Sequence, residues 1–262
     1  MSGDDDELQC ERQGPVVLLR MNRPHARNAL NTGLVRRLSA ALADLNDDQQ
    51  VRAVVLTGTA PGFCAGSDLK ELAGLTPAGV TRHEAATAYA VRAVQRLGLP
   101  VIAAVEGFAI GGGFLLATGC DGVVSDAGAR WHLPEVRLGW VPPWGLQSLV
   151  ARAGPAAAKL VAWGDRPLTG ADLHRLAVVD EITGPGEAVG CALAWAGRLA
   201  ALPAHAVAST KLALAAVVAD SAEAMDARTT ALFDEDCRSG AARHTLSAYG
   251  PGSGRDSVEQ SR

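Results

Sequence analysis

Cysteine is scarce in this chain, and groups of metal ligands are missing. The five cysteines are scattered over 262 residues, without a C-x-x-C pair or a histidine cluster at metal-ligand spacing. This pattern excludes the common zinc motifs and favours reduced thiols in a cytosol. We therefore expect a cytoplasmic protein that binds no metal.

Excess positive charge and long uncharged runs are also missing. The chain has 24 basic and 28 acidic residues spread along its length, with a net charge of −4, so nucleic acid is not an expected partner. No uncharged stretch reaches the ~20 residues of a membrane span. The N-terminal MSGDDDELQ is acidic where a signal peptide would be basic and then apolar. We expect no membrane partner either.

The chain is rich in apolar residues, which make up 48% of it and are enough for a large core. Strand-like runs alternate with helix-like ones, which predicts an α/β fold with crossover connections. The strand-like runs begin at Pro15, Val51, Pro100, Gly122 and Val178.

Only helix-like segments follow Gly186, namely 192–202, 205–219 and 222–237. The predicted organisation is a flexible N-terminus (1–13), an α/β core (14–200), a helical region (201–249) and a disordered tail (250–262).

Three adjacent glycines stand where a predicted strand enters a predicted helix, in EGFAIGGGFLLATGCD from Glu106. Such a turn exposes unpaired N–H groups at the positive end of a helix dipole. The pattern is neither G-x-x-x-x-G-K-[ST] nor G-x-G-x-x-G, so a nucleotide site loses its main support. An oxyanion hole, which needs two donors, is the other use of such a turn. GFCAGSDLKEL, from Gly62, repeats the arrangement and supplies a second exposed turn.

A carboxylate in apolar surroundings is the third candidate element. Glu135 follows Pro134 in ARWHLPEVRLGWVPPWG, where burial would raise its pKa toward the range useful for proton transfer. The alternative is a surface glutamate on a loop. On a continuous strand, His132 would face away from Glu135, so we expect a structural or rim role for it.

These stretches together resemble a known family. PHARNAL (from Pro24), GFCAGSDLKE, PVIAAVEGFAIGGG with ATGCD, and HLPEVRLG occur in the order and at the spacing of the crotonase superfamily, or enoyl-CoA hydratase/isomerase family. The resemblance covers about residues 10–250. It implies an α/β crotonase-type spiral of repeated ββα units with a helical C-terminal trimerisation region. It also implies an acyl-CoA substrate, no cofactor beyond the coenzyme A of that substrate, and a homotrimer or hexamer.

The resemblance also assigns residues to roles. The amides of Ser67 and Gly112 would grip the thioester oxygen, and Glu135 would move the proton. Phe233 falls in a segment that closes a neighbouring CoA site in relatives, or it serves as packing. Exposed cations at Arg23, Arg27 and Lys70 are candidate phosphate partners. The substrate and CoA would be bound by Arg27, Ala65, Asp68, Leu69, Lys70, Leu115 and Trp144.

One departure from the family pattern bears on the reaction. Leu115 stands where hydratases carry the first of two glutamates, which favours moving a double bond over adding water. Glu135 alone would carry a proton from C2 to C4 of a 3-enoyl-CoA, with the dienolate held in the oxyanion hole. A hydratase-like reaction, another enolate reaction (decarboxylation, hydrolysis, carbon–carbon bond chemistry) and a catalytically idle acyl-CoA-binding or assembly subunit remain as alternatives.

Overall fold

A six-stranded sheet forms the centre of the molecule, in the order β1-β2-β3-β4-β6-β9. The computed structural model describes residues 7–250, without side-chain detail at 216–221. Strands β2 to β9 of this sheet run parallel, and β1 is antiparallel to β2. All of β3 is buried, as expected for a parallel sheet covered on both faces. The strands are β1 (Leu8–Gln13), β2 (Val16–Met21), β3 (Ala53–Gly58), β4 (Val101–Val105), β6 (Gly122–Asp126) and β9 (Glu181–Thr183).

Strand β1 corrects the prediction of a flexible N-terminus as far as residues 8–13 are concerned. These residues pair in register with β2, from Leu8 opposite Met21 to Gln13 opposite Val16. Their last four side chains are exposed, so the polar composition is that of an edge strand rather than of a loop. The rest of the predicted terminal segments, 1–6 and 251–262, lies outside the described residues.

A second, three-stranded sheet contains β5 (Phe108–Ile110), β7 (Arg130–His132) and β8 (Leu168–Thr169). Strand β4 leads into β5 and then helix α4 (Gly112–Thr118), while β6 leads into β7 and then helix α5 (Glu135–Leu138). Each ββα unit therefore gives one strand to each sheet, as the resemblance implied. The parallel pairing of β5 with β7 puts Ile110 beside His132, so the chain ends that follow both strands start from one edge.

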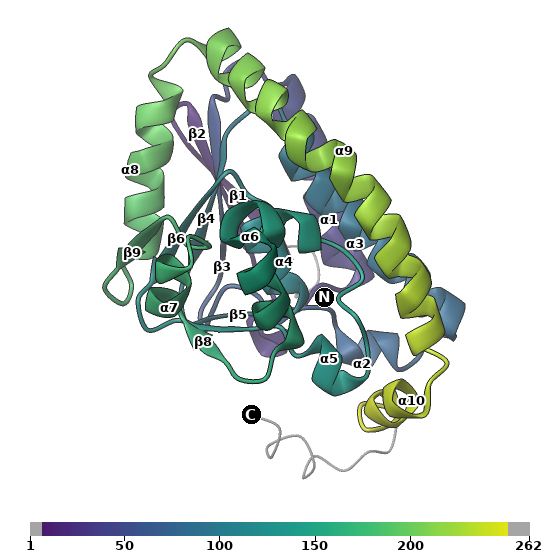
Figure 1. Cartoon of the computed structure of the whole chain (residues 1–262). Helices are drawn as coiled ribbons and strands as arrows, with labels where there is room; N and C mark the ends of the chain where they lie inside the picture. Colours follow the sequence, from purple (N-terminus) through teal and green to yellow (C-terminus); the bar gives the residue numbers. More distant parts are fainter. Residues whose placement is uncertain (1–6, 251–262) are drawn as a thin grey trace, which may run out of the picture.

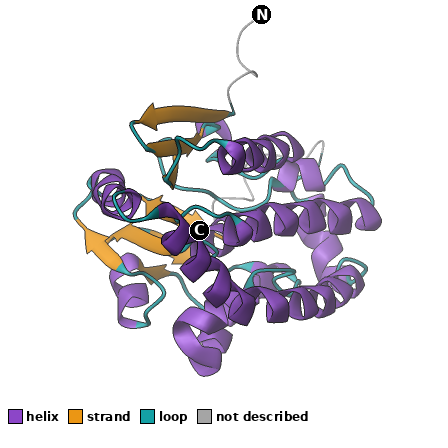
Figure 2. Ribbon diagram, turned by 90° about the horizontal axis from the view of Figure 1, so that it is seen from above, coloured by secondary structure: helices purple, strands orange, loops and turns teal. Residues whose placement is uncertain are grey.

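Helices cover both faces of the main sheet. On one face, α8 (Ala188–Ala200) packs its buried alanines against the strands, since small side chains allow a close approach. On the other face lie α1 (Thr32–Asp47), α3 (Pro77–Arg96) and α6 (Leu146–Trp163). In Figure 2 the strands gather on one side of the molecule and most of the helices on the other. Shorter helices are η1 (Pro24–Ala26), α2 (Leu69–Leu72) and α7 (Gly170–Arg175).

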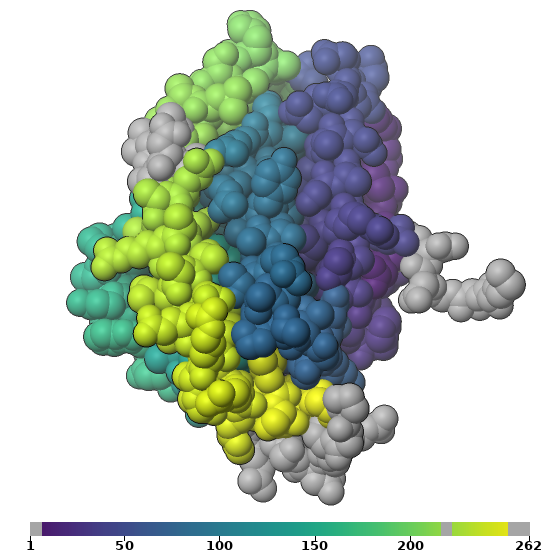
Figure 3. Space-filling view, turned by 90° about the vertical axis from the view of Figure 1, so that its right-hand side faces the viewer, coloured from purple at the N-terminus to yellow at the C-terminus, as the bar shows by residue number. Residues whose placement is uncertain are grey.

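The C-terminal region divides into helices differently from the prediction. The segments 205–219 and 222–237 belong to a single helix, α9 (Ala204–Asp236), because no glycine or proline separates them. Helix α9 lies along α3 (Figures 1 and 3), where Arg92 pairs with Asp226 at 2.6 Å. The following helix, α10 (Gly240–Ser247), lies beside α5 and α2 (Figure 1).

None of the described helices is, by itself, both long and apolar enough to cross a membrane; α8 and residues 204–215 would qualify only as a pair, bent by 109°.

Candidate active site

The two glycine turns meet in space. Leu30 pairs with Ser67, and Cys64 pairs with Ala109, in isolated parallel bridges. Leu30 donates its N–H to the Gly66 carbonyl at 2.8 Å, and the Asp68 N–H reaches the Leu30 carbonyl at 3.0 Å. A Cβ built on Gly66 would lie 3.2 Å from the Gly112 nitrogen. The turn before α2 and the turn before α4 are therefore in contact.

Both predicted oxyanion donors keep their amides available. Because Gly66 and Asp68 bond to Leu30, the N–H of Ser67 between them points to the other side of the chain. Gly112 is the first residue of α4, so its N–H lies in the turn that has no partner within the helix. Among residues 7–250, neither amide donates a hydrogen bond. The arrangement suits two N–H groups that receive one oxygen.

Close approach explains the run of glycines. A Cβ on Gly113 would lie 2.3 Å from the carbonyl oxygen of Cys64, so only glycine lets α4 start against the other turn. Gly111 has φ +53°, and a Cβ there would stand 2.9 Å from Oε1 of Glu135. Because Gly113 and Gly111 have no side chains, the Cys64 carbonyl and the Glu135 carboxyl can both lie against this turn.

Glu135 is the first residue of α5. Its Oε2 is buried and accepts no hydrogen bond within the described part of the chain. Burial raises the pKa of this carboxyl to about 8; its own backbone N–H opposes the rise, and the negative charge of Glu84 adds to it. Such a group is a strong proton acceptor once ionised, and a proton donor near neutral pH.

Glu84 is a functional candidate that the sequence reasoning missed. It lies on α3, 5% exposed, and accepts hydrogen bonds from Ser67 Oγ (2.6 Å) and Trp144 Nε1 (2.8 Å). Val80, Glu84, Thr87 and Val91 recur at helical spacing, which puts the glutamate on the buried face of an amphipathic helix. A charged residue within that apolar stripe was the signal available in the sequence.

These groups line one cavity of about 240 Å³. Most of the predicted site residues reach it, namely Arg27, Ala65, Ser67, Leu69, Gly112, Leu115, Glu135 and Trp144. The structure adds Leu72, Glu84, Arg130, Leu138, Trp140, Phe233 and Tyr249, among others. Leu115 is completely buried, so the position for which the resemblance implies a glutamate in hydratases is apolar here.

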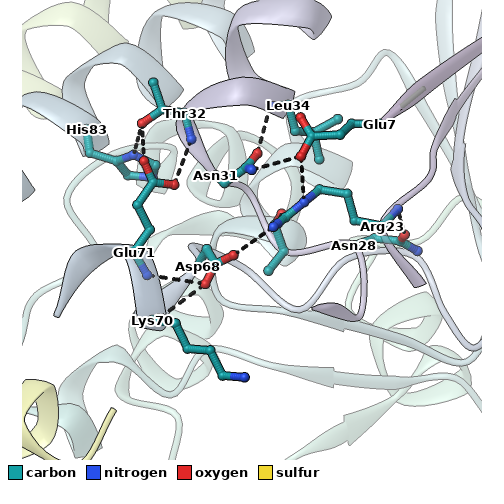
Figure 4. Close-up of polar contacts among 11 residues, drawn as sticks. Glu7, Arg23, Asn28, Asn31, Thr32, Leu34, Asp68, Lys70, Glu71 and His83 are labelled. Atoms are coloured by element: carbon teal, nitrogen blue, oxygen red, sulfur yellow. Dashed lines mark hydrogen bonds and ion pairs between the residues drawn. The ribbon is translucent and has the colours of Figure 1, made fainter. Parts of the chain in front are cut away.

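Asp68 and Lys70 do not line this cavity. Asp68 caps α2 by accepting from the N–H groups of Lys70 (3.2 Å) and Glu71 (3.4 Å), and it pairs with Arg23 at 3.0 Å. Arg23 is buried and also pairs with Glu7 at 2.9 Å, so its charge is used within the fold. The ammonium of Lys70 points away from Asp68 and Arg23 (Figure 4), and the residue is exposed.

The expectation that His132 faces away from Glu135 was wrong. Strand β7 ends at His132, and the chain turns at Leu133 and Pro134 before α5 begins. Both His132 and Glu135 therefore line the same cavity. Burial lowers the pKa of His132, and its Nε2 lies 3.0 Å from the carbonyl oxygen of Gly164.

The C-terminal helices close the cavity of their own chain. Phe233, near the end of α9, is 4% exposed and packs against Trp140 with ring centroids 6.1 Å apart. Tyr249, just after α10, also lines the cavity. The packing role, which was the alternative for Phe233, is therefore observed, and closure of a neighbouring site stays a prediction.

Two cysteines and an aspartate near the glycine turns have roles in the fold and not in the proposed chemistry. Burial raises the pKa of the Cys64 and Cys120 thiols to about 12, so neither is a thiolate at neutral pH. Asp121 accepts from the Val101 N–H and from Lys211 Nζ, both at 2.7 Å, and so braces the sheet. Within the described residues, no group of three or more His, Cys, Asp or Glu could hold a metal ion.

Comparison with known proteins places these features in a family. The family model described as enoyl-CoA hydratase/isomerase matches residues 11–250. The 2,3-dehydroadipyl-CoA hydratase of Escherichia coli is 36% identical over 177 residues, which cover 67% of this chain and 69% of that protein. The short-chain-enoyl-CoA hydratase of Clostridium acetobutylicum is 31% identical over 206 residues, 78% and 79% of the two chains.

A solved structure agrees with this assignment. The enoyl-CoA hydratase/isomerase of Pseudoalteromonas atlantica superposes with a TM-score of 0.83 at 27% identity, covering 93% of this chain and 96% of that one. The fold is thus the mixed α/β crotonase fold with a helical C-terminal region. The chain belongs to the enoyl-CoA hydratase/isomerase family of enzymes.

Proposed function

We propose that the chain isomerises 3-enoyl-CoA to 2-enoyl-CoA, with Glu135 as the proton shuttle. One observation carries the proposal: Glu135 presents a buried carboxyl with an unbonded oxygen beside the paired glycine turns. Leu115 is fully buried at the position where, by the family resemblance, hydratases carry the first of their two glutamates.

The proposed reaction needs one base and one oxyanion hole. The thioester oxygen accepts from the amides of Ser67 and Gly112, and ionised Glu135 removes a proton from C2. The electrons of the C2–H bond enter a dienolate, whose negative oxygen the two amides stabilise. Glu135 then returns the proton to C4, leaving the double bond between C2 and C3. Loss of one such donor typically raises the barrier by ~2.7 to 4 kcal/mol.

Apolar walls support isomerisation over addition of water. Leu115 and Trp144 are both at most 1% exposed, and Trp140 and Phe233 lie on the cavity wall. A dienolate surrounded by such side chains meets little water. Ala65 and Leu69 line the same cavity, and the Arg27 guanidinium lies 4.4 Å from the centroid of the Phe108 ring. We assign the CoA portion of the substrate to this side, with exposed Lys70 as a partner outside the cavity.

Hydration is the second candidate, and two observations favour it. The relatives named above are called hydratases. Glu84 also brings a second carboxylate to the cavity, from α3 rather than from α4. In that case the Glu84 carboxylate would take a proton from the water as its oxygen adds to C3, and protonated Glu135 would give a proton to C2.

Incubation with 3-enoyl- and 2-enoyl-CoA in deuterated water separates the candidates. Isomerisation predicts conversion of 3-enoyl-CoA to 2-enoyl-CoA without 3-hydroxyacyl-CoA, and deuterium enters C2 or C4 to the extent that the proton held by Glu135 exchanges with solvent. Hydration predicts 3-hydroxyacyl-CoA instead. Neither conversion nor exchange on either substrate would contradict both candidates. Glu135→Gln should abolish conversion while CoA-ester binding, measured by calorimetry, stays nearly intact; unchanged turnover would remove Glu135 from the reaction.

We further infer a homotrimer or hexamer in the cytoplasm. A groove lined by Val136, Trp140, Leu146 and Trp163, with the neighbouring Leu160 60% exposed, supports association through α6. Light scattering coupled to size exclusion would measure the mass, and a monomer would contradict the inference.

A further inference from the structure

Glu84 joins two parts of the active site that are distant in sequence. Its hydrogen-bond partners, Ser67 and Trp144, are 17 and 60 residues away from it. Both bonds come from neutral donors, a hydroxyl and an indole N–H, and they end on different oxygens of the one carboxylate. Because the residue is 5% exposed, water does not compete freely for these bonds.

Each partner of Glu84 touches one oxyanion donor. Ser67 carries the first amide on its own backbone, and its hydroxyl is tied to Oε1 of Glu84. The Trp144 ring packs against the second, since its Cζ2 would lie 3.2 Å from a Cβ built on Gly112. The carboxylate of Glu84 therefore links the turn before α2, through Ser67, to the Trp144 ring beside the start of α4.

We propose that Glu84 is a positioning residue, which holds the Ser67 turn and the Trp144 ring so that both oxyanion amides grip a single substrate oxygen. The inference rests on the proposed function, because it concerns the same oxyanion hole. It applies equally to isomerisation and to hydration. The positions of the two amides matter for the rate, because a misplacement of about 1 Å at such a site costs on the order of 100-fold in rate.

Glu84 also shapes the charge of the cavity. Its negative charge is one of the two causes that raise the pKa of Glu135, burial being the larger. The other titratable or charged groups on the cavity wall are Arg27, Arg130, His132 and Tyr249, with the buried Cys237 thiol packed nearby. Removing the charge of Glu84 should therefore make Glu135 easier to ionise.

Glu84→Gln tests both effects in the full-length enzyme. The glutamine keeps one acceptor oxygen but presents an NH₂ group to either the Ser67 hydroxyl or the Trp144 N–H. One of the two hydrogen bonds that Glu84 accepts is therefore lost. We expect kcat to fall on the order of 10- to 100-fold with KM changed less than about threefold. The acid limb of the pH profile should move to lower pH. Unchanged kcat together with an unmoved pH profile would overturn the proposal.

Combining the variant with Ser67→Ala shows whether Glu84 acts through Ser67. Ser67→Ala keeps the amide and loses only the hydroxyl, so it should itself lower kcat, on the order of tenfold. If the two residues act as a unit, Glu84→Gln costs much less in the Ser67→Ala background than alone. Fully additive effects of the two substitutions on kcat would contradict the proposal that Glu84 acts through Ser67.

Glu106→Gln is the matched control. Glu106 also accepts two hydrogen bonds, from the N–H groups of Gly186 (3.0 Å) and Ala188 (2.7 Å), but it lies outside the cavity. Its substitution should affect stability without moving the pH profile. If Glu84→Gln does not fold, Ser67→Ala and Trp144→Phe carry the test, and normal kcat in both would overturn the proposal. Activity that survives Glu135→Gln would instead reject the proposed function.

Discussion

Glu135 lies directly against Gly111: its Oε1 is 2.9 Å from the point where a Cβ on that glycine would stand. Gly111 immediately precedes α4, whose first residue supplies the second oxyanion amide. The contact therefore fixes how far the proposed base lies from the oxygen-binding turn. A side chain at Gly111 is therefore unfavourable for two reasons: it would meet the Glu135 carboxyl, and the backbone there has a positive φ of 53°.

Gly111→Ala should remove most of the activity. The methyl group would displace the Glu135 carboxyl, and a non-glycine residue in this backbone conformation is strained by roughly 1–3 kcal/mol. We expect kcat to fall on the order of 100-fold and thermal stability to fall as well. Gly190→Ala is the control, because a Cβ there meets nothing within 4 Å and alanine favours a helix. Normal kcat for Gly111→Ala would refute the contact.

The activity should depend on pH through Glu135. Isomerisation needs the ionised base, and burial raises the pKa of this carboxyl to about 8. We expect kcat/KM to rise with pH, about tenfold per unit well below the pKa, and to level off above it. Rates measured between pH 5 and pH 10 with a 3-enoyl-CoA check this. A plateau reached already at pH 6 would mean that Glu135 is not the titrating base.

Replacing Glu135 should make the fold more stable at high pH. The native carboxyl has its pKa raised from 4.5 to about 8, so between these values the native state binds more protons than the unfolded state. The stability of the unmodified protein therefore falls as pH rises through this window, whereas glutamine does not titrate. Glu135→Gln should gain on the order of 2 kcal/mol at pH 9 and nothing at pH 4. Urea unfolding at both pH values measures the difference, with exposed Glu235→Gln on α9 as the control. Equal gains at pH 4 and pH 9 would exclude a raised pKa.

Phe233→Ala should loosen the end of α9 and the cavity together. Truncating a buried phenylalanine typically costs about 3 kcal/mol or more, and its ring contact with Trp140 would be lost. We expect lower stability and a higher KM for acyl-CoA. Leu232→Ala removes a side chain that is 46% exposed on the adjacent position, so it should cost well under ~1 kcal/mol. Equal effects of the two substitutions would show that Phe233 does not close the site.

Leu115→Glu should add hydratase activity if an absent carboxylate limits that reaction. Leu115 is fully buried, so the new carboxylate faces a large desolvation penalty and the fold should be less stable. Leu115→Gln is the control, because it has the same size but transfers no proton. Formation of 3-hydroxyacyl-CoA by the glutamate variant alone would support the explanation. No gain over the glutamine variant would show that Leu115 is not what limits hydration.

The sequence determined the parts of the molecule that local patterns specify. Apolar runs located β2, β3, β4 and β6, because residues buried on both faces of a parallel sheet are apolar throughout. The family motifs identified the glycine turns and Glu135, since close backbone approach permits glycine alone at Gly113. Polar edge strand β1 was missed because its composition equals that of a loop.

Only the tertiary structure decided what surrounds the proposed base. Leu72, Glu84 and Tyr249 come from three separate helices or loops, and no spacing in the sequence says that they share a cavity with Glu135. A pKa near 8 likewise arises from burial and from a charge 51 positions away in the chain (135 − 84). Burial and electrostatics act through space, whereas a sequence motif reports only neighbours along the chain.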